Sequence, residues 1–315
     1  MKDKKENHHF FLRGLAAIGV IVLFLSPLDC LGQMDELFGG VKMSDNLETV
    51  KEEMEKHCVS VEGISIDTEE ISFPLAQFTE QHLICSDCKR YDYYFFDKIV
   101  FTFSDGQLSF ISAKGDGVSK ISDIEYYEGY KFYTGKDNMV IHEKENEAFF
   151  LTKEGLHTNL FAWKNPYLST GKVVTKYTAS AVVPKVFKFG EAIQELKPRL
   201  RGMTTLLDER EFPNGEIQLN CFGMEYAGFP RKIEAKFNTE GKLSLLWILT
   251  AKQEESRLRK ALIKAYGNPI FVNKTWEVFH DWQVSLRKDK PEVLVLSKEG
   301  VEKHKIQVMG IGENH

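Results

Sequence analysis

Cys85 and Cys88 are separated by two residues, a spacing that suggests chemistry more directly than any other in this chain. A Cys-x-x-Cys pair serves as a redox dithiol, as half of a metal site or as a structural disulfide. Redox catalysis needs the first cysteine at a helix N-terminus, where the helix dipole lowers its pKa. The residues after Cys88 are aromatic and typical of a strand, so the sequence favours a disulfide.

The N-terminus is typical of a secretory signal. A basic segment precedes the uncharged stretch Gly14–Leu25, and small residues at Cys30 and Gly32 suit cleavage before Gln33. A membrane-spanning helix needs about 20 apolar residues, so this stretch is too short to be one. The sequence predicts a cleavable signal peptide, no transmembrane segment in the mature chain, and export to the periplasm, cell surface or medium. Lipoprotein processing at Cys30 is an alternative, although the residues before it fit poorly.

Histidines near the cysteines keep a metal site open as an alternative. His82 precedes Cys85 and Cys88 as His-x-x-Cys-x-x-Cys, and the neighbours His57 and Cys58 would supply further ligands. Thiols of exported proteins tend to oxidise, however. We therefore expect no metal or other cofactor, and at least one disulfide, formed by Cys85 with Cys88 or by one of them with Cys58. Cys221, which lies in the other copy, is expected to stay free.

Aromatic residues form a second candidate site. Tyr91, Tyr93 and Tyr94 lie in a run typical of a strand, and Trp276 and Trp282 flank a His-Asp pair. Such rings provide either an exposed platform for a glycan or peptide, or packing between strands. Packing is their commoner use, and these five residues are our candidate binding residues.

The His-Asp pair, His280 and Asp281, invites comparison with general-base catalysis. Adjacent residues of a strand face opposite sides, so the two cannot form a hydrogen-bonded catalytic pair there. The sequence instead predicts a turn or an edge between two strands at this point.

The elements that carry these residues occur twice. Residues 139–156 align without a gap on residues 284–301. Each segment is typical of a strand, a polar turn, a second strand and a Lys-Glu-Gly exit. Preceding blocks also match in order, with a helix and then a hairpin that turns through Gly106 in one block and Gly241 in the other. Because the order repeats, the chain is a duplication of a domain-sized unit.

The sequence therefore predicts an α+β fold with two tandem copies of a unit made of a helix and an antiparallel meander sheet. We divide the chain into a signal peptide at 1–32, a first repeat at 33–161, a linker at 162–186 and a second repeat at 187–315. A long helix at 250–267 is expected only in the second copy. Residues 305–308 are expected to form its last strand.

Composition narrows the function classes. The net charge of −5 argues against nucleic-acid binding through a basic surface. The sequence contains no nucleophile elbow, zinc-protease helix, phosphate loop, dinucleotide fingerprint or calcium loop. Catalytic groups scattered along the chain would escape such motifs, so an enzyme is less favoured but still open.

Several boundary features point to known repeat proteins: Phe189-Gly190 opening a helix, the Gly106 and Gly241 hairpins, and Tyr266-Gly267-Asn268-Pro269 closing a helix before a tryptophan-bearing strand. The arrangement resembles exported tandem α/β-repeat proteins of the beta-lactamase-inhibitor-protein type, and also BamE-like periplasmic modules. The resemblance implies protein binding, and it assigns no functional residue.

Two functions follow as expectations. The first is non-enzymatic binding of another protein or a cell-envelope component. The alternative is an envelope hydrolase with its site in the cleft between the repeats. A pocket with clustered acids or histidines of shifted pKa favours the enzyme, whereas a broad sheet surface without such a cluster favours binding.

Overall fold

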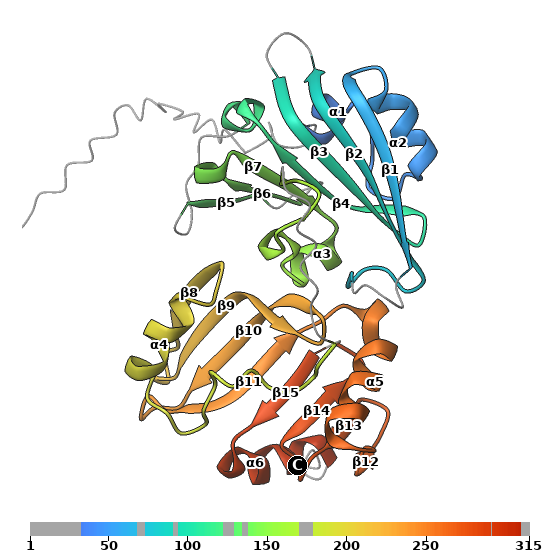
Figure 1. Ribbon diagram of the computed structural model, residues 1–315. Helices are drawn as coiled ribbons and strands as arrows, with labels where there is room; N and C mark the ends of the chain where they lie inside the picture. The colour runs from blue at the N-terminus through green and yellow to red at the C-terminus, as the bar shows by residue number, and fades with distance from the viewer. Residues whose placement is uncertain are drawn as a thin grey trace, which may run out of the picture.

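The computed structural model describes residues 33–67, 73–90, 94–121, 129–133, 138–169, 179–290 and 292–309. It contains two antiparallel sheets, of seven and eight strands, with a few helices on each, and so confirms the expected α+β fold of two similar units. Figure 1 shows the first unit, in blue to green, above the second, in yellow to red. The predicted signal peptide lies outside the described residues.

The first repeat is built on a sheet in the order β1-β2-β3-β4-β7-β6-β5. Its strands are β1 (Cys58–Asp67), β2 (Thr79–Arg90), β3 (Tyr94–Ser104), β4 (Gln107–Lys114), β5 (Tyr130–Tyr133), β6 (Asn138–His142) and β7 (Glu147–Leu151). Its helices are α1 (Gln33–Phe38), α2 (Leu47–Met54), α3 (Lys153–His157) and the short 3-10 turns η2 (Asp116–Lys120), η3 (Glu143–Glu145) and η4 (Leu160–Ala162).

The second repeat has the same strand order, with one strand added at an edge: β12-β13-β14-β15-β11-β10-β9-β8. Its strands are β8 (Leu206–Glu211), β9 (Ile217–Tyr226), β10 (Phe229–Phe237), β11 (Leu243–Leu249), β12 (Phe271–Val272), β13 (Trp276–Phe279), β14 (Val284–Arg287) and β15 (Glu292–Leu296). Its helices are α4 (Ile193–Arg201), η5 (Lys252–Glu254), α5 (Glu255–Tyr266) and α6 (Lys298–Met309).

The register of the strands repeats residue by residue. Met139 lies opposite Phe150 in the β6–β7 pair, and the aligned residue Val284 lies opposite Val295 in β14–β15. An irregular step also follows Thr102 in β3 and recurs at the same point of β10, after Lys236. The sheets therefore share their local irregularities as well as their strand order.

The Lys-Glu-Gly exits of the aligned segments are helix starts. Thr152 Oγ1 accepts a hydrogen bond of 3.0 Å from the backbone N–H of Gly155 at the start of α3. Ser297 Oγ accepts one of 3.0 Å from Gly300 at the start of α6. Both hydroxyls satisfy a backbone donor that the helix itself leaves unpaired. The predicted strand at 305–308 is wrong, because these residues continue α6.

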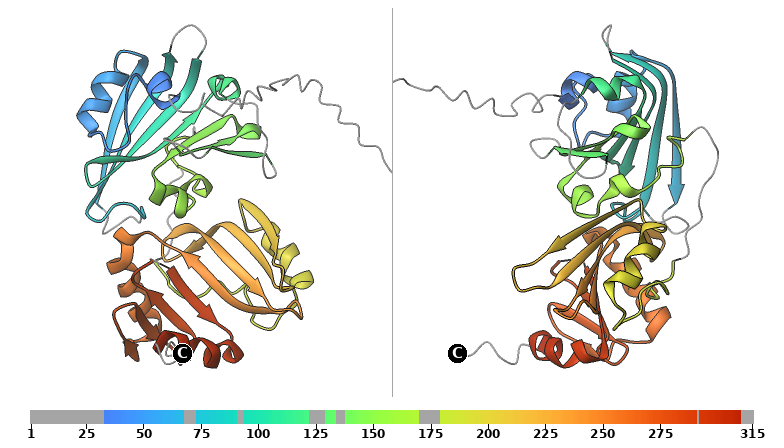
Figure 2. Two further views of the ribbon diagram at one scale, coloured as in Figure 1. Left: turned by 180° about the vertical axis from the view of Figure 1, so that it is seen from behind. Right: turned by 90° about the vertical axis from the view of Figure 1, so that its left-hand side faces the viewer.

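One face of each sheet packs against helices from its own repeat. Figure 2 shows α1 and α2, in blue, on one side of the first sheet, where Val50 and Met54 are buried. In the second repeat α4 and α5 cover the equivalent core, into which α5 inserts Leu258 and Leu262. Burying each such side chain contributes about 1.5–3 kcal/mol. At the same point in the order of elements, between β4 and β5, the described residues of the first repeat form the short turn η2.

A shared apolar cluster joins the two repeats. Phe73 of the first repeat and Trp163, which follows η4, contact Phe229 of the second repeat, with ring centroids 5.9 and 5.6 Å apart. Phe161 lies 5.6 Å from Phe222. All five rings are largely buried, so the units are packed together through side chains. Figure 1 shows α3 between the two sheets at this junction.

The second repeat differs from the first at the positions that make this junction. Leu206 and Phe222 lie opposite each other in β8 and β9 and belong to the shared cluster. The corresponding pair in β1 and β2 is Ser60 and Ser86, of which Ser60 is exposed and Ser86 half-buried. Among the described residues, no helix has the length and apolar character needed to cross a membrane.

Candidate functional site

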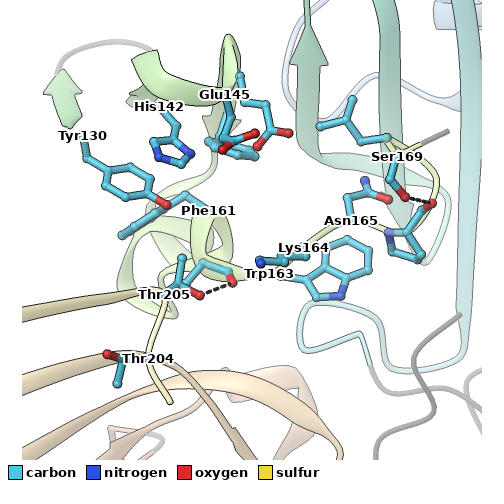
Figure 3. Close-up of a pocket in the computed structure, with 15 residues that line it drawn as sticks. Tyr130, His142, Glu145, Phe161, Trp163, Lys164, Asn165, Ser169, Thr204 and Thr205 are labelled. Atoms are coloured by element: carbon cyan, nitrogen blue, oxygen red, sulfur yellow. Dashed lines mark hydrogen bonds between the residues drawn. The ribbon is translucent and has the colours of Figure 1, made fainter. Parts of the chain in front are cut away.

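A pocket of about 530 Å³ opens beside the junction of the two repeats. Its lining comes from β5, β6 and β7, from the turns η3 and η4, from residues 163–166, 168 and 169, and from Thr204 and Thr205 of the second repeat. We call residues 163–169 the strap. Figure 3 shows Thr204 and Thr205 on the side of the second repeat, below the side chains of the first. The volume is typical of sites that hold small molecules.

Tyr130 and His142 form one wall of this pocket. They are direct partners across β5 and β6, and their rings stack with centroids 4.2 Å apart at an angle of 9°. Burial lowers the pKa of His142, and the nearby carboxylates of Glu147 and Glu145 only partly offset this. Burial, together with the same carboxylates, raises the pKa of Tyr130 to about 12. Both rings are therefore mainly uncharged at pH 7.

Two carboxylates and one ammonium group belong to the lining. Glu147 Oε1 lies 3.2 Å from Nζ of Lys114 on the neighbouring strand β4. Glu145 is exposed at the end of η3, and Lys164 is exposed on the strap. The pocket thus combines a buried aromatic floor with a charged and polar rim, which Figure 3 shows in Glu145 and Lys164.

Side chains of the strap hold it on the first sheet by a hydrogen bond and by ring packing. The Asn165 side-chain amide donates a 2.8 Å hydrogen bond to Ser112 Oγ, and its carbonyl oxygen accepts one from the Tyr167 backbone. Trp163 packs between Phe110 and Phe229. The strap begins the segment predicted as a linker, and its described residues form a wall of the pocket.

The second repeat contributes two hydroxyls to the pocket. Thr204 Oγ1 donates to the carbonyl of Leu200 at 3.0 Å, and Thr205 Oγ1 lies 3.5 Å from the carbonyl of Ala162 in η4. The Thr205 backbone N–H donates to Phe222, which belongs to the shared cluster. The same packing that joins the repeats therefore positions these side chains.

Sequence reasoning missed a buried polar group beneath the strap. His82 Nε2 lies 2.5 Å from Glu80 Oε1, and His82 Nδ1 lies 3.0 Å from Thr102 Oγ1. The ring of Tyr167 covers His82, with centroids 4.5 Å apart. Glu80, His82 and Thr102 are almost fully buried, so no substrate reaches them in this conformation. The sequence signal that could have revealed this group is the alternation of polar residues along the strand predicted there.

The disulfide joins Cys88 to Cys58, which is its direct partner across β1 and β2, with Cα atoms 4.0 Å apart. Of the two expected pairings, the one with Cys58 is confirmed and the bond between Cys85 and Cys88 is wrong, because Cys85 carries a free buried thiol. Two residues three positions apart on one strand are separated by about 10 Å, beyond the reach of a disulfide. Cys58 is near enough because it belongs to the adjacent strand.

The two free cysteines of the described residues occupy equivalent positions of the repeats. Cys85 lies opposite Ile99, and Cys221 lies opposite the matched residue Ile233. Burial raises the pKa of each thiol to about 12. Both thiols are therefore protonated at neutral pH and belong to the apolar cores. Among the described residues, no group of three or more histidine, cysteine, aspartate or glutamate side chains has the geometry of a metal site.

The predicted aromatic residues fall in different places. Tyr91 and Tyr93 lie outside the described residues, and Tyr94 is the first residue of β3. Trp276 and Trp282 are half-buried and pack against one small apolar cluster on the second sheet. Neither tryptophan lines the pocket. The structure thus keeps the two tryptophans together but separates them from the pocket.

His280 and Asp281 form a turn. Their φ angles are 44° and 49°, and the turn connects β13 to β14. This agrees with the prediction of a turn rather than a catalytic pair at this point.

No family model, no curated protein and no solved structure matches this chain. The resemblance to tandem α/β-repeat proteins therefore rests on the order of the elements alone.

Proposed function

We propose that this protein is an exported, non-enzymatic binding protein whose ligand occupies the pocket between the repeats. One observation carries the proposal: the pocket is lined by both copies of the duplicated unit. A binding site at the junction needs side chains from both repeats, so neither repeat would form it alone. The ligand is a cell-envelope component or a part of one.

Binding is favoured over catalysis by the state of the polar groups. The hydroxyls of Thr204 and Thr205 point to backbone carbonyls of Leu200 and Ala162. An activated hydroxyl nucleophile needs a hydrogen-bonded base instead. His142, the one histidine of the described lining, stacks on Tyr130.

The proposal is tested by fluorine NMR. The four tryptophans are replaced biosynthetically by 5-fluorotryptophan, and the Trp163 resonance is assigned with Trp163→Phe. Mixtures of small sugars, short peptides, amines and carboxylic acids are then added separately. We expect one mixture to shift the Trp163 signal and leave the Trp247 signal unchanged. If no mixture moves the Trp163 signal, the pocket is not a binding site.

A hydrolase using the same pocket is the second candidate. The observation that favours it is the presence of His142, with its lowered pKa, beside Glu145 and Glu147. A neutral imidazole of this kind can accept a proton from water. Product analysis of the same mixtures after incubation separates the two functions. Hydrolysis that is lost in His142→Ala would replace binding by catalysis.

A further inference from the structure

We infer that the outer edge of β1 pairs with an extended segment of another polypeptide that carries basic side chains. β1 lies at one edge of the first sheet, and β5, which contributes to the lining of the pocket, lies at the other edge (Figure 1). The edge of β1 is therefore a second interaction surface, apart from the pocket, and the inference goes beyond the proposed function.

The edge of β1 is long and regular. Its ten residues keep one register with β2, from the Cys58–Cys88 pair to the Asp67–Thr79 pair, so the strand spans about 33 Å. Every second residue of an edge strand directs its N–H and C=O groups outward. Within the described part of the chain, these outward groups of β1 have no hydrogen-bond partner. A further strand would satisfy them, which is a common way for a sheet to bind a peptide.

The other sheet edges are protected, whereas β1 is not. Natural proteins protect edge strands by keeping them short or by placing charged residues or proline in them. β12 has two residues and β5 has four. β8 holds the place of β1 in the second repeat, and four of its six residues are charged: Asp208, Glu209, Arg210 and Glu211. β1 contains no lysine, arginine or proline, and Glu62 is the charged group among its described side chains.

The side chains of β1 leave room for an added strand. Ser60, Gly63 and Ser65 are small and exposed, and the side chain of Val59 is 81% exposed. Val61 is only partly buried against the core of the first repeat. A further strand can therefore approach the backbone of β1, and its apolar side chains can cover the valines.

Charge selects the kind of strand. Val61 faces the core that α2 covers, so its neighbour Glu62, which is exposed, lies on the opposite face of the sheet. The helix α2 contacts β1 and contains three glutamates and one lysine. That lysine, Lys51, lies 4.0 Å from Glu55. Among the described residues Glu52 and Glu62 have no cationic partner, so acidic groups flank the edge on both faces. A strand with basic side chains is complementary to them.

The bases beside this edge gather at the Cys58 end of the strand. Lys56 precedes β1 and lies 2.6 Å from Glu53, and Lys89 follows the disulfide residue Cys88. Glu62 lies in the middle of β1 and is therefore the side chain that a basic residue of the partner should face.

A second copy of this chain suits the edge less well. Two identical antiparallel strands related by a two-fold axis place one residue opposite itself. A register centred on Glu62 sets two glutamates opposite each other, which is destabilising. Every register also places both α2 helices on the same face, next to the shared edge, where their excess acidic groups repel.

Fluorescence anisotropy of labelled peptides mixed with the purified protein tests the inference. The probe is an eight-residue peptide of alternating lysine and valine. One control replaces the lysines with glutamates. The second keeps the lysines and uses D-valine, which preserves the charge and composition but prevents a regular strand. We expect the Kd of the probe to be at least about tenfold lower than that of either control, and high salt to weaken its binding.

A matched pair of variants tests the role of charge at the edge. Glu62→Lys and Glu211→Lys make the same change in the equivalent edge strands β1 and β8, and both side chains are exposed. We expect Glu62→Lys to raise the Kd of the probe about threefold or more, and Glu211→Lys to change it less than about twofold. Equal thermal stability of the two variants excludes misfolding as the cause.

Hydrogen exchange locates the bound peptide. The outward amides of β1 have no partner, so they should exchange quickly in the protein alone and slowly once paired. We expect the probe to slow exchange in residues 58–67 and to leave residues 206–211 of β8 unchanged.

Three results would overturn the inference. Absence of probe binding, or equal binding of the D-valine control, would show that the edge does not pair with a strand. Slowed exchange outside residues 58–67 alone would place the peptide elsewhere. Slowed exchange in 58–67 that rises with protein concentration without any peptide, together with dimers in sedimentation velocity, would make a second copy the occupant.

Discussion

The wall of the pocket has a structural counterpart in the second repeat, and the two differ in chemistry. In the first repeat Tyr130 pairs with His142 across β5 and β6, and His142 faces Glu147 across β6 and β7. In the second repeat Trp276 pairs with Arg287 across β13 and β14, and Arg287 faces a glutamate of β15 in the same way. An aromatic ring, a nitrogen-rich side chain and a carboxylate thus recur at equivalent positions.

In the second repeat, the side chains at these positions interact with partners from the same repeat. The Arg287 guanidinium lies 5.7 Å from the Trp276 ring centroid, and its nitrogens donate to Asp289 at 2.9 and 3.2 Å. These hydrogen bonds to Asp289 raise the pKa of Arg287. Burial raises the pKa of Glu292 beside it. The arginine is therefore held between partners of its own repeat, where a ligand would have to displace them.

The difference teaches where the duplicated unit tolerates change. Strand order, register and the hydroxyl caps of α3 and α6 are shared by the two repeats, whereas the three-residue set lines a pocket in one copy and forms an internal ion pair in the other. The pocket also needed two additions that are not part of the repeated unit, the strap and the side chains supplied by the other copy. Several changes test how independent the two copies are.

The largest effect is expected at the ion pair that anchors α5, a helix without a counterpart of similar length among the described residues of the first repeat. The Arg231 guanidinium donates to Glu254 at 2.7 Å and to the Tyr226 carbonyl at 2.7 Å, and both charged groups are almost fully buried. Arg231→Met leaves the Glu254 charge buried and unpaired. We expect the free energy of unfolding to fall by about 3–5 kcal/mol, as measured by urea denaturation.

The matched control for this change is the double variant Arg231→Met/Glu254→Leu. It removes both charges, so most of the lost stability should return. If the double variant is as unstable as the single one, the ion pair is not the reason for the loss.

The disulfide is specific to the first repeat and should have the next largest effect. Cys58→Ser opens a loop whose ends are 30 residues apart, which costs about 2–4 kcal/mol of stability. Reductant should destabilise the native protein by a similar amount and leave Cys58→Ser unchanged. In unfolded, unreduced protein, Cys85 and Cys221 should react with iodoacetamide while Cys58 and Cys88 do not. Alkylation of Cys58 under these conditions would contradict the bond.

The strap should respond to Asn165→Ala by a smaller amount. The change removes hydrogen bonds to Ser112 and to the Tyr167 backbone, and the buried Ser112 hydroxyl loses its donor. We expect a loss of about 1–3 kcal/mol and a red shift of the Trp163 fluorescence. Adding Ser112→Ala should recover part of the stability. Unchanged fluorescence would mean that other contacts hold the strap.

The smallest effect is expected from the pH dependence of His142. Its folded-state pKa is lowered, so the folded protein binds protons less readily than the unfolded chain does. Stability is unaffected well above the unfolded pKa of about 6.5 and falls as the pH drops through it. His142→Gln should therefore gain stability relative to the native protein at pH 5 compared with pH 7. The matched variant Arg287→Gln should show no such change near neutral pH.

The duplication was predictable because it depends on local patterns. The alignment of 139–156 with 284–301 matched the register that the strands adopt, including the residues at both helix starts. The strand predicted at 305–308 failed because four alternating residues are too few to distinguish strand from helix. There the helix that starts at the Ser297 cap continues through them.

The pocket was not predictable because its parts are distant in sequence. Trp163 and Asn165 were assigned to a linker, since nothing local indicates that they pack on β4. Thr204 and Thr205 gain significance only from the packing of one repeat on the other. The candidate site from sequence followed conspicuous residue types, Trp276 and Trp282, which lie outside the pocket and pack in part against one apolar cluster.

Ser60 and Ser86 stand in the first repeat where the second repeat has Leu206 and Phe222. This difference also bears on whether further repeats could add to the molecule. Two tandem copies joined head to tail form a heterologous contact, and such a contact has no internal symmetry to close it. If the first repeat carried the apolar pair as well, another molecule could add to it in the same way, and so on into a filament. Ser60, exposed at the equivalent position, adds no apolar side chain to that surface. The two serines therefore leave the first repeat without the apolar pair that the second repeat uses for this contact.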